Sequence, residues 1–136
     1  MKSLASAQTT REANGLTAKD MRRLQRRLEE ERRGLLARLR HHVGEATEDT
    51  EPLTDEMDIA SRHQDQALLL RLADKERKLL AEIDHALAKF GEDTYGICEG
   101  TGEPIGVKRL EARPWTRFSI QYKERLERER GGRREQ

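Results

Sequence analysis

Cysteine and aromatic residues are scarce in this 136-residue chain, and the scarcity of cysteine excludes two kinds of structural cross-link. Cys98 is the only cysteine, so the chain can form no internal disulfide and no all-cysteine zinc site. Apolar residues make up 34% of the sequence and charged residues 39%. Such a composition can bury a seam between helices or a small cluster, but not a thick globular core.

Long apolar runs are absent from the sequence as well. No window approaches the roughly 20 apolar residues of a membrane-spanning helix, so no membrane segment is expected. Residues 1–16 contain polar residues throughout and lack the apolar run of a secretory signal. We interpret this segment as a flexible leader and expect a cytoplasmic protein.

The net charge of +1 hides a strong segregation of charge along the chain. Residues 45–58 carry seven carboxylates and no basic residue, whereas the stretches 19–40 and 108–134 are rich in arginine. A protein that binds duplex DNA more usually shows one continuous basic face, so direct DNA binding is not expected. The distribution of charge along the chain therefore says more about binding partners than the net charge does.

An amphipathic helix is predicted to begin after Thr17. This residue is a suitable N-cap, and Asp20 follows three residues later as in a capping box. Leu16 can pack against Met21 as a hydrophobic staple, and Gly44 is the predicted C-terminal stop. The predicted apolar face consists of Met21, Leu24, Leu28, Leu35, Leu36, Leu39 and Val43.

A second helix is predicted after the acidic segment, because Pro52 interrupts the first pattern. It should begin between Thr54 and Asp58 and end near Lys89, just before Gly91. Its predicted apolar face consists of Leu69, Leu72, Leu79, Ile83, Leu87 and Phe90. Neither helix can bury its stripe alone, so we expect an antiparallel two-helix coiled coil over residues 17–90 with an acidic tip near 45–58.

The character of the chain changes after Gly91. Residues 92–114 contain four glycines and two prolines, which indicates turns and a β-hairpin-like knuckle. Residues 115–130 regain a helical pattern, which the pair Gly131 and Gly132 is predicted to end. A small apolar cluster centred on Trp115 and Tyr122 is expected to contain Tyr95, Ile97, Ile105, Leu110, Trp115, Phe118, Ile120 and Tyr122.

Two stretches of sequence carry a resemblance to a known family. Residues 95–114, YGICEGTGEPIGVKRLEARP, resemble the zinc-finger signature of the DksA/TraR family of bacterial transcription regulators, and residues 54–60, TDEMDIA, resemble its acidic tip motif. The resemblance implies a mainly α fold. Its parts are a long antiparallel two-helix coiled-coil hairpin, a small zinc-finger-like domain over residues 91–136, and a C-terminal helix within that domain.

The finger keeps the family's ligand spacing but not its ligands. The family has the pattern Cys-x2-Cys-x17-Cys-x2-Cys, and the matching positions are Cys98, Thr101, Ser119 and Tyr122. Hydroxyl groups are poor substitutes for the thiolate or imidazole donors of tetrahedral zinc, so zinc is predicted to be absent. A redox-sensing thiol is the less favoured interpretation of Cys98, because the chain has no resolving cysteine.

The tip motif leads to a functional expectation. The family carries Asp-x-x-Asp-x-Ala at its coiled-coil tip, and Asp55, Asp58 and Ala60 reproduce it. The resemblance implies a regulator that enters the secondary channel of RNA polymerase, places its tip near the active centre and alters open-complex stability and initiation. Asp55 and Asp58 can also cap the second helix, and the two roles are compatible.

The resemblance also implies contacts outside the tip. Arg71 and Lys75 match basic positions at which family members dock on the polymerase. The site for guanosine tetraphosphate, the signal of the stringent response, is matched by Leu79, Arg109, Arg113 and Lys123. Glu82 stands where the family often has a lysine, and its carboxylate would repel a polyphosphate. The nucleotide is therefore retained as a candidate co-regulator.

Two other functions stay open at this point. A transcript-cleavage factor of the GreA type also has an acidic coiled-coil tip, although its domain order differs and it lacks a finger. A generic coiled-coil interaction module would use the helices without the tip carboxylates. The resemblance favours a monomeric regulator that is not an enzyme and has RNA polymerase as its partner.

Overall fold

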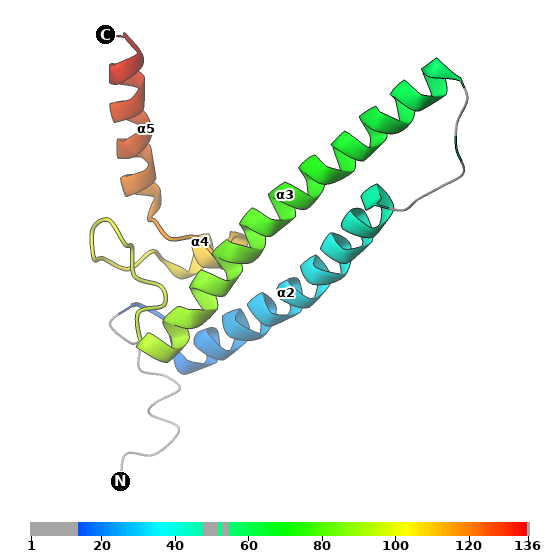
Figure 1. The fold of residues 1–136 in the computed structure, drawn as a ribbon. Helices are drawn as coiled ribbons and strands as arrows, with labels where there is room; N and C mark the ends of the chain where they lie inside the picture. The colour runs from blue at the N-terminus through cyan, green and yellow to red at the C-terminus, as the bar shows by residue number, and fades with distance from the viewer. Residues whose placement is uncertain (1–13, 48–51, 53–54, 136) are drawn as a thin grey trace. The chain divides into compact units, whose positions relative to one another are not determined.

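The computed structural model describes residues 14–47, 52 and 55–135 of the chain (Figure 1). Most of these residues belong to the helices α2 (Ala18–Thr47), α3 (Glu56–Glu92), α4 (Val107–Ala112) and α5 (Ile120–Glu135). Over the same residues, β structure is limited to one isolated antiparallel bridge between Ile97 and Pro104. None of the described helices is both long and apolar enough to span a bilayer. The predicted mainly helical fold class is confirmed.

The described chain forms two compact units. One consists of the described residues up to Glu29 together with those from Glu82 onward, and the other consists of residues Glu30–Ala81. Each unit contains a length of α2 paired with a length of α3, as expected for a helical hairpin. Residues 1–13 of the predicted leader lie outside the described residues, but Asn14 and Leu16 are buried in the first unit.

The predicted capping box at the start of α2 is confirmed. The hydroxyl of Thr17 accepts a hydrogen bond from the backbone N–H of Asp20 at 3.0 Å, and the Asp20 carboxylate accepts one from Thr17 N–H at 3.1 Å. Just before the cap, the side chain of Asn14 donates to the carbonyl oxygen of Tyr95 at 2.8 Å. This bond ties the start of α2 to the segment that follows α3.

Gly44 does not end α2, contrary to the sequence prediction. The helix continues to Thr47, whose hydroxyl donates to the carbonyl oxygen of Val43 at 2.8 Å. A glycine inside a helix costs only about 1 kcal/mol relative to alanine. Ala46 is buried beyond the glycine, so its packing favours another helical turn.

The unit Glu30–Ala81 is a helix pair with a narrow seam. Among the residues of this unit that the structure describes, the buried apolar ones are Leu35 and Ala46 from α2 and Ala73 from α3. Between the helices, His42 Nδ1 contacts a carboxylate oxygen of Glu76, and Arg38 Nε lies 4.0 Å from the other oxygen. The seam is therefore partly polar, which agrees with the low apolar content of the chain.

The predicted apolar face of α3 is wrong at Leu72. This side chain is 37% exposed, whereas its neighbour Ala73 is fully buried and Leu69 is half-buried. Leucines occupy positions 68, 69, 70 and 72, so steps of three and four residues fit more than one face of the helix. The observed inner face instead continues from Ala73 through Glu76 and Leu80.

The end of α3 also lies beyond its predicted position near Lys89. The helix includes Gly91 and ends at Glu92, and Asp93 follows in the left-handed region with φ 58°. The backbone N–H of Thr94 then donates to the carbonyl oxygen of Lys89 at 3.0 Å, which closes a Schellman-type turn. Asp93, one of the residue types that tolerates positive φ, thus ends the helix in place of the glycine.

The predicted hairpin-like knuckle follows α3. Cys98 N–H donates to the carbonyl oxygen of Glu103 at 2.8 Å, and Ile105 N–H donates to that of Gly96 at 2.8 Å. These two bonds flank the bridge between residues 97 and 104. The knuckle thus holds the backbone of residues 96–98 against that of residues 103–105.

The apolar core of the first unit includes Tyr95 and is not centred on Trp115 and Tyr122 as predicted. The Tyr95 side chain is buried and stacks on Phe90 with ring centroids 4.0 Å apart. Its hydroxyl donates to the carbonyl oxygen of Pro114 at 2.8 Å. Trp115 and Tyr122 are only half-buried.

The short helix α4 lies in a segment that was predicted to contain turns and a hairpin-like knuckle but no helix. Leu110 is its buried residue, and Glu111 accepts a hydrogen bond from Arg23 of α2 at 2.6 Å. The helix is too short to produce a clear period in the sequence. It forms because Leu110 packs inward while Glu111 reaches α2.

α5 begins later and ends later than predicted. Ser119 caps it at the N-terminus: its hydroxyl accepts from Tyr122 N–H at 3.3 Å, and its carbonyl oxygen accepts from Lys123 N–H at 3.0 Å. The helix passes through both glycines at 131 and 132 and reaches Glu135. Ile120, expected in the apolar cluster, is exposed in its first turn.

Candidate functional site

The acidic motif lies at the first turn of α3. The Asp55 carboxylate accepts a hydrogen bond from Met57 N–H at 2.9 Å, and the Asp55 carbonyl oxygen accepts one from Ile59 N–H at 2.9 Å. Asp58, in the first turn of the helix, and Ala60, two residues later, are exposed. Residues 48–51, 53 and 54 of the acidic segment lie outside the described residues. Asp55 is thus an N-cap, while Asp58 presents its carboxylate to solvent near the positive end of the helix dipole.

Arg71 and Lys75 lie further along α3, in the unit Glu30–Ala81. Both are exposed. Residues four apart lie on one face of a helix, so the two cations are neighbours on the surface.

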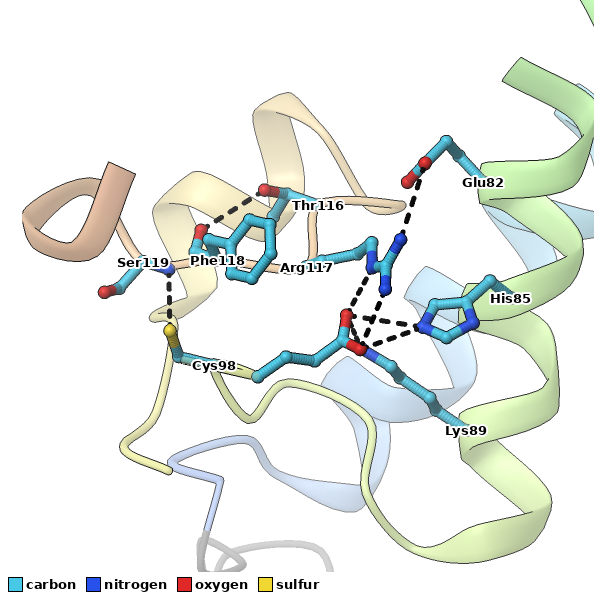
Figure 2. A network of polar contacts seen from close by, with 9 residues as sticks. Glu82, His85, Lys89, Cys98, Thr116, Arg117, Phe118 and Ser119 are labelled. Carbon is cyan, nitrogen blue, oxygen red and sulfur yellow. Dashed lines mark hydrogen bonds and ion pairs between the residues drawn. The ribbon is translucent and has the colours of Figure 1, made fainter. Parts of the chain in front are cut away.

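The positions that match the zinc ligands lie close together, joined by hydrogen bonds and packing; Figure 2 shows two of them, Cys98 and Ser119. Ser119 N–H donates to Cys98 Sγ at 3.3 Å, and the hydroxyl of Thr101 accepts from Glu103 N–H at 3.3 Å. The Tyr122 ring packs directly against Gly100, where a Cβ atom would overlap it. The four side chains therefore fill the place of a metal site with one thiol, the two hydroxyls of Thr101 and Ser119, and the aromatic ring of Tyr122.

The thiol of Cys98 is buried at the centre of this group. Burial by itself raises the pKa of the thiol, but hydrogen bonds from Thr101 and Ser119 outweigh it and lower the pKa to about 6. The hydrogen bonds from Thr101 and Ser119 thus stabilise the thiolate form of Cys98 in the way that a bound metal ion would. One thiolate with three hydroxyl-bearing neighbours is not a donor set that holds structural zinc.

Glu99, the residue after Cys98, joins the knuckle to α3 through a cluster of charges (Figure 2). Its carboxylate accepts from Arg117 at 2.5 Å and 3.2 Å and from Lys89 Nζ at 3.2 Å, and His85 Nε2 lies 3.2 Å away. Arg117 Nη1 is also 3.9 Å from the carboxylate of Glu82. Glu82, His85 and Lys89 all come from α3, so the cluster fixes the knuckle against that helix.

The charges of this cluster stabilise each other. The hydrogen bond from Arg117 is the main reason why the pKa of Glu99 falls to about 2; partial burial opposes it, and Lys89 reinforces it. The same hydrogen bond raises the pKa of Arg117. Lys89 is only 7% exposed, so its ammonium depends on Glu99 for compensation.

The positions that match the nucleotide site are only partly available. Arg109 Nε donates to the carbonyl oxygen of Phe118 at 2.8 Å, so this side chain links α4 to the segment before α5. Arg113 lines a cavity of about 270 Å³, and the Glu82 carboxylate lines the same cavity. Lys123 is exposed on α5, and Leu79 belongs to the other unit. A carboxylate in this cavity weakens its attraction for a polyphosphate.

Family comparison explains the tandem arrangement of hairpin and finger. Residues 20–90 match the family described as DnaK suppressor protein DksA, N-terminal domain. The chain belongs to the DksA family. Residues 93–121 match the prokaryotic dksA/traR C4-type zinc finger, so the finger segment has the family's sequence pattern despite its single cysteine.

Curated relatives and a solved structure resemble this DksA-family chain. The RNA polymerase-binding transcription factor DksA of Caulobacter vibrioides is 46% identical over 94 residues, 69% of this chain and 66% of that protein. The factor of the same name from Escherichia coli is 41% identical over 69 residues, 51% of this chain and 46% of that protein. The matched stretch thus spans less than two thirds of either relative. Transcription factor DksA2 from Pseudomonas aeruginosa matches with a TM-score of 0.75 and 39% identity, over 83% of this chain and 87% of that one.

The zinc of a C4 finger does not fit the residues of this DksA-family chain. The described part of the chain holds no group of three or more His, Cys, Asp or Glu side chains arranged to bind a metal ion. At the ligand positions, Ser119 caps α5 and the Tyr122 ring fills space against Gly100. The finger is held instead by these contacts and by the cluster around Glu99.

Sequence reasoning missed the cluster around Glu99. Part of the signal is present in the sequence, because Glu82, His85 and Lys89 are spaced three and four apart and therefore share one face of α3. The partners Glu99 and Arg117 come from separate segments of the finger. Only the fold brings those segments together.

Proposed function

We propose that this DksA-family chain binds RNA polymerase and regulates transcription initiation without being an enzyme. Relatives from Caulobacter vibrioides and Escherichia coli are named as RNA polymerase-binding transcription factors, which supports the proposal. The observation that carries it is the exposed Asp58 and Ala60 beside Asp55 at the start of α3, within the stretch that matches the DksA N-terminal domain.

In the proposed mechanism, the helical hairpin enters the secondary channel of the polymerase and its tip reaches the neighbourhood of the active centre. The Asp58 carboxylate is free to engage basic side chains or to perturb the metal-bearing centre electrostatically. The small side chain of Ala60 permits a close approach. Asp55 keeps the first turn of α3 folded, so that the carboxylate of Asp58 is held in place. The outcome is a change in the stability of the open complex.

The docking contacts and the co-regulator form the second part of the proposal. Arg71 and Lys75 are proposed to meet the polymerase outside the channel. Guanosine tetraphosphate is the proposed co-regulator, and its contacts would come from Leu79, Arg109, Arg113 and Lys123. Glu82 opposes the phosphates, so we expect a smaller response to the nucleotide than a lysine at that position would give. The factor is proposed to act as a cytoplasmic monomer with no direct DNA contact.

The test is initiation in vitro at a ribosomal-RNA-type promoter with purified polymerase. The variant Asp55→Asn, Asp58→Asn removes both charges and leaves an asparagine that can still cap α3. Wild type should alter transcript yield, and the variant should bind the polymerase equally well but lose the effect. An unchanged effect in the variant would refute the role of the tip.

A transcript-cleavage assay on stalled complexes separates the proposal from its enzymatic rival. The proposed regulator should leave the stalled transcript intact. Shortening of the transcript that depends on Asp58 would instead identify a cleavage factor.

A further inference from the structure

Met57 lies in the first turn of α3, between Asp55 and Asp58 of the acidic motif, and its side chain is 80% exposed. Among the large apolar side chains that the structure describes, it is the most exposed. Ile59, two residues later and on the other side of the helix, is half-buried. The hairpin therefore leaves the thioether of Met57 open to solvent.

The geometry of the helix places Met57 between two residues of the acidic motif. Successive residues of an α-helix are rotated by about 100°, so Asp58 and Ala60 point about 160° apart. Met57 lies within that arc, about 60° from Ala60 and about 100° from Asp58. A partner surface that contacts both Asp58 and Ala60 across this arc therefore also covers Met57.

Met21 is the other methionine that the structure describes, and its sulfur is shielded. The side chain is half-buried, and Asn14 Nδ2 donates a hydrogen bond to its sulfur at 3.3 Å. A thioether reacts with an oxidant through a sulfur lone pair, which the oxidant must reach. Met57 should therefore be oxidised faster than Met21, and the chain carries its own reference for the comparison.

We propose that Met57 is an oxidation site at which peroxides weaken the action of the acidic motif on RNA polymerase. The regulatory part of this inference rests on the proposed function. The sulfur lone pair of Met57 attacks one oxygen of hydrogen peroxide, an S–O bond forms as the O–O bond breaks, and the other oxygen leaves as water. The sulfur is oxidised by two electrons to the sulfoxide, and the peroxide is reduced by two.

The sulfoxide changes what a partner surface meets at this position. Oxidation converts a flexible apolar side chain into a polar one, and methionine sulfoxide reductases reverse the change. Covering a sulfoxide oxygen without a hydrogen-bond donor costs free energy that covering a thioether does not. The charges of Asp55 and Asp58 are untouched, so the site adds a reversible control to the carboxylates.

The first experiment measures selectivity in the full chain. Wild type is treated with dilute hydrogen peroxide, and oxidation at each methionine is followed over time by peptide mass spectrometry. The sulfoxide should form at Met57 about fivefold or more faster than at Met21, since exposure governs the reaction. Equal rates at the two residues would overturn the assignment of Met57 as the oxidation site.

The second experiment measures the consequence for open complexes. The treated chain is desalted, incubated with dithiothreitol and added to untreated polymerase at a ribosomal-RNA-type promoter. Dithiothreitol reverses sulfenic acid or disulfide at Cys98 but not methionine sulfoxide. The concentration of chain that gives half of the effect on open-complex lifetime should rise about fivefold or more, and methionine sulfoxide reductases A and B should restore it.

Matched variants assign the loss to one sulfur. Each is compared with itself before and after peroxide, and circular dichroism verifies its helices. Met57→Leu keeps an apolar side chain and leaves Met1, Met21 and Cys98 in place, so peroxide should no longer change its effect. Met21→Leu should lose its effect on oxidation as wild type does. Met57→Gln, polar and of similar length, should show the loss without peroxide.

The outcomes separate the inference from the function on which it rests. Full activity of the chain oxidised at Met57 would overturn the control and leave the proposed function intact. The same loss in oxidised Met57→Leu as in wild type would also overturn it, because another group would then be responsible. No effect of the unoxidised wild type on open complexes would overturn the proposed function and the control together, whereas the selectivity of oxidation would still stand on the mass spectrometry.

Discussion

Glu99→Gln is expected to destabilise the finger, because Glu99 is the carboxylate that Lys89 and Arg117 share. The fall of its pKa from 4.5 to about 2 corresponds to about 3 kcal/mol if taken at full value. The carboxylate side chain is 29% exposed, so solvent screening reduces this amount. We therefore expect the free energy of unfolding to fall by about 1–2 kcal/mol at neutral pH.

The effect of Glu99→Gln should depend on pH in a defined direction. Since the pKa of Glu99 is lower in the folded state, its stabilisation is present above about pH 4.5 and is lost as the pH falls toward 2. The stability difference between wild type and variant should shrink across the same range. Urea unfolding followed by the fluorescence of Trp115, the only tryptophan, reports on the unit that contains the cluster.

Glu103→Gln is the matched control for this prediction. Glu103 is an exposed carboxylate of the same knuckle, and its substitution should change the free energy of unfolding by less than about 0.5 kcal/mol. If Glu99→Gln were no more destabilising than this control at neutral pH, the charge cluster would not hold the finger. A stability difference that stayed constant down to pH 2 would contradict the pKa argument.

Three further predictions concern the degenerate finger. The purified chain should contain far less than stoichiometric zinc by elemental analysis, and a chelator should leave its melting temperature unchanged; stoichiometric zinc would contradict this. Gly100→Ala should cost about 1–3 kcal/mol in chemical unfolding, because the new methyl group overlaps the Tyr122 ring, whereas Gly131→Ala, with open space around it, should stabilise α5 slightly. The ultraviolet absorbance of the Cys98 thiolate should titrate near pH 6 in the folded protein, and a midpoint near 9 would show that the hydrogen bonds from Ser119 and Thr101 do not act as described.

Local signals in the sequence were sufficient for the start of α2. The capping box of Thr17 and Asp20 depends on residues three apart, and both of its hydrogen bonds form. The glycines were poorer guides. Gly44 and Gly91 lie inside helices, because the cost of one glycine is smaller than the gain from packing or capping further along the chain.

Features that depend on distant residues could not be predicted in this way. The face on which Leu72 lies depends on which neighbour α2 covers, and several leucines competed for that place. The burial of Tyr95 depends on Phe90 and on the carbonyl oxygen of Pro114. Similarly, the ligand positions of the finger were found from their spacing, but the capping role of Ser119 appeared only in the structure.

The lifetime of open complexes at a ribosomal-RNA-type promoter, measured with and without the chain, tests the central claim most directly. Wild type should shorten the lifetime, and Asp55→Asn, Asp58→Asn should restore the lifetime of polymerase alone while still binding the enzyme. Identical shortening by wild type and variant, or no effect of wild type, would contradict a regulator that acts through the carboxylates at the start of α3.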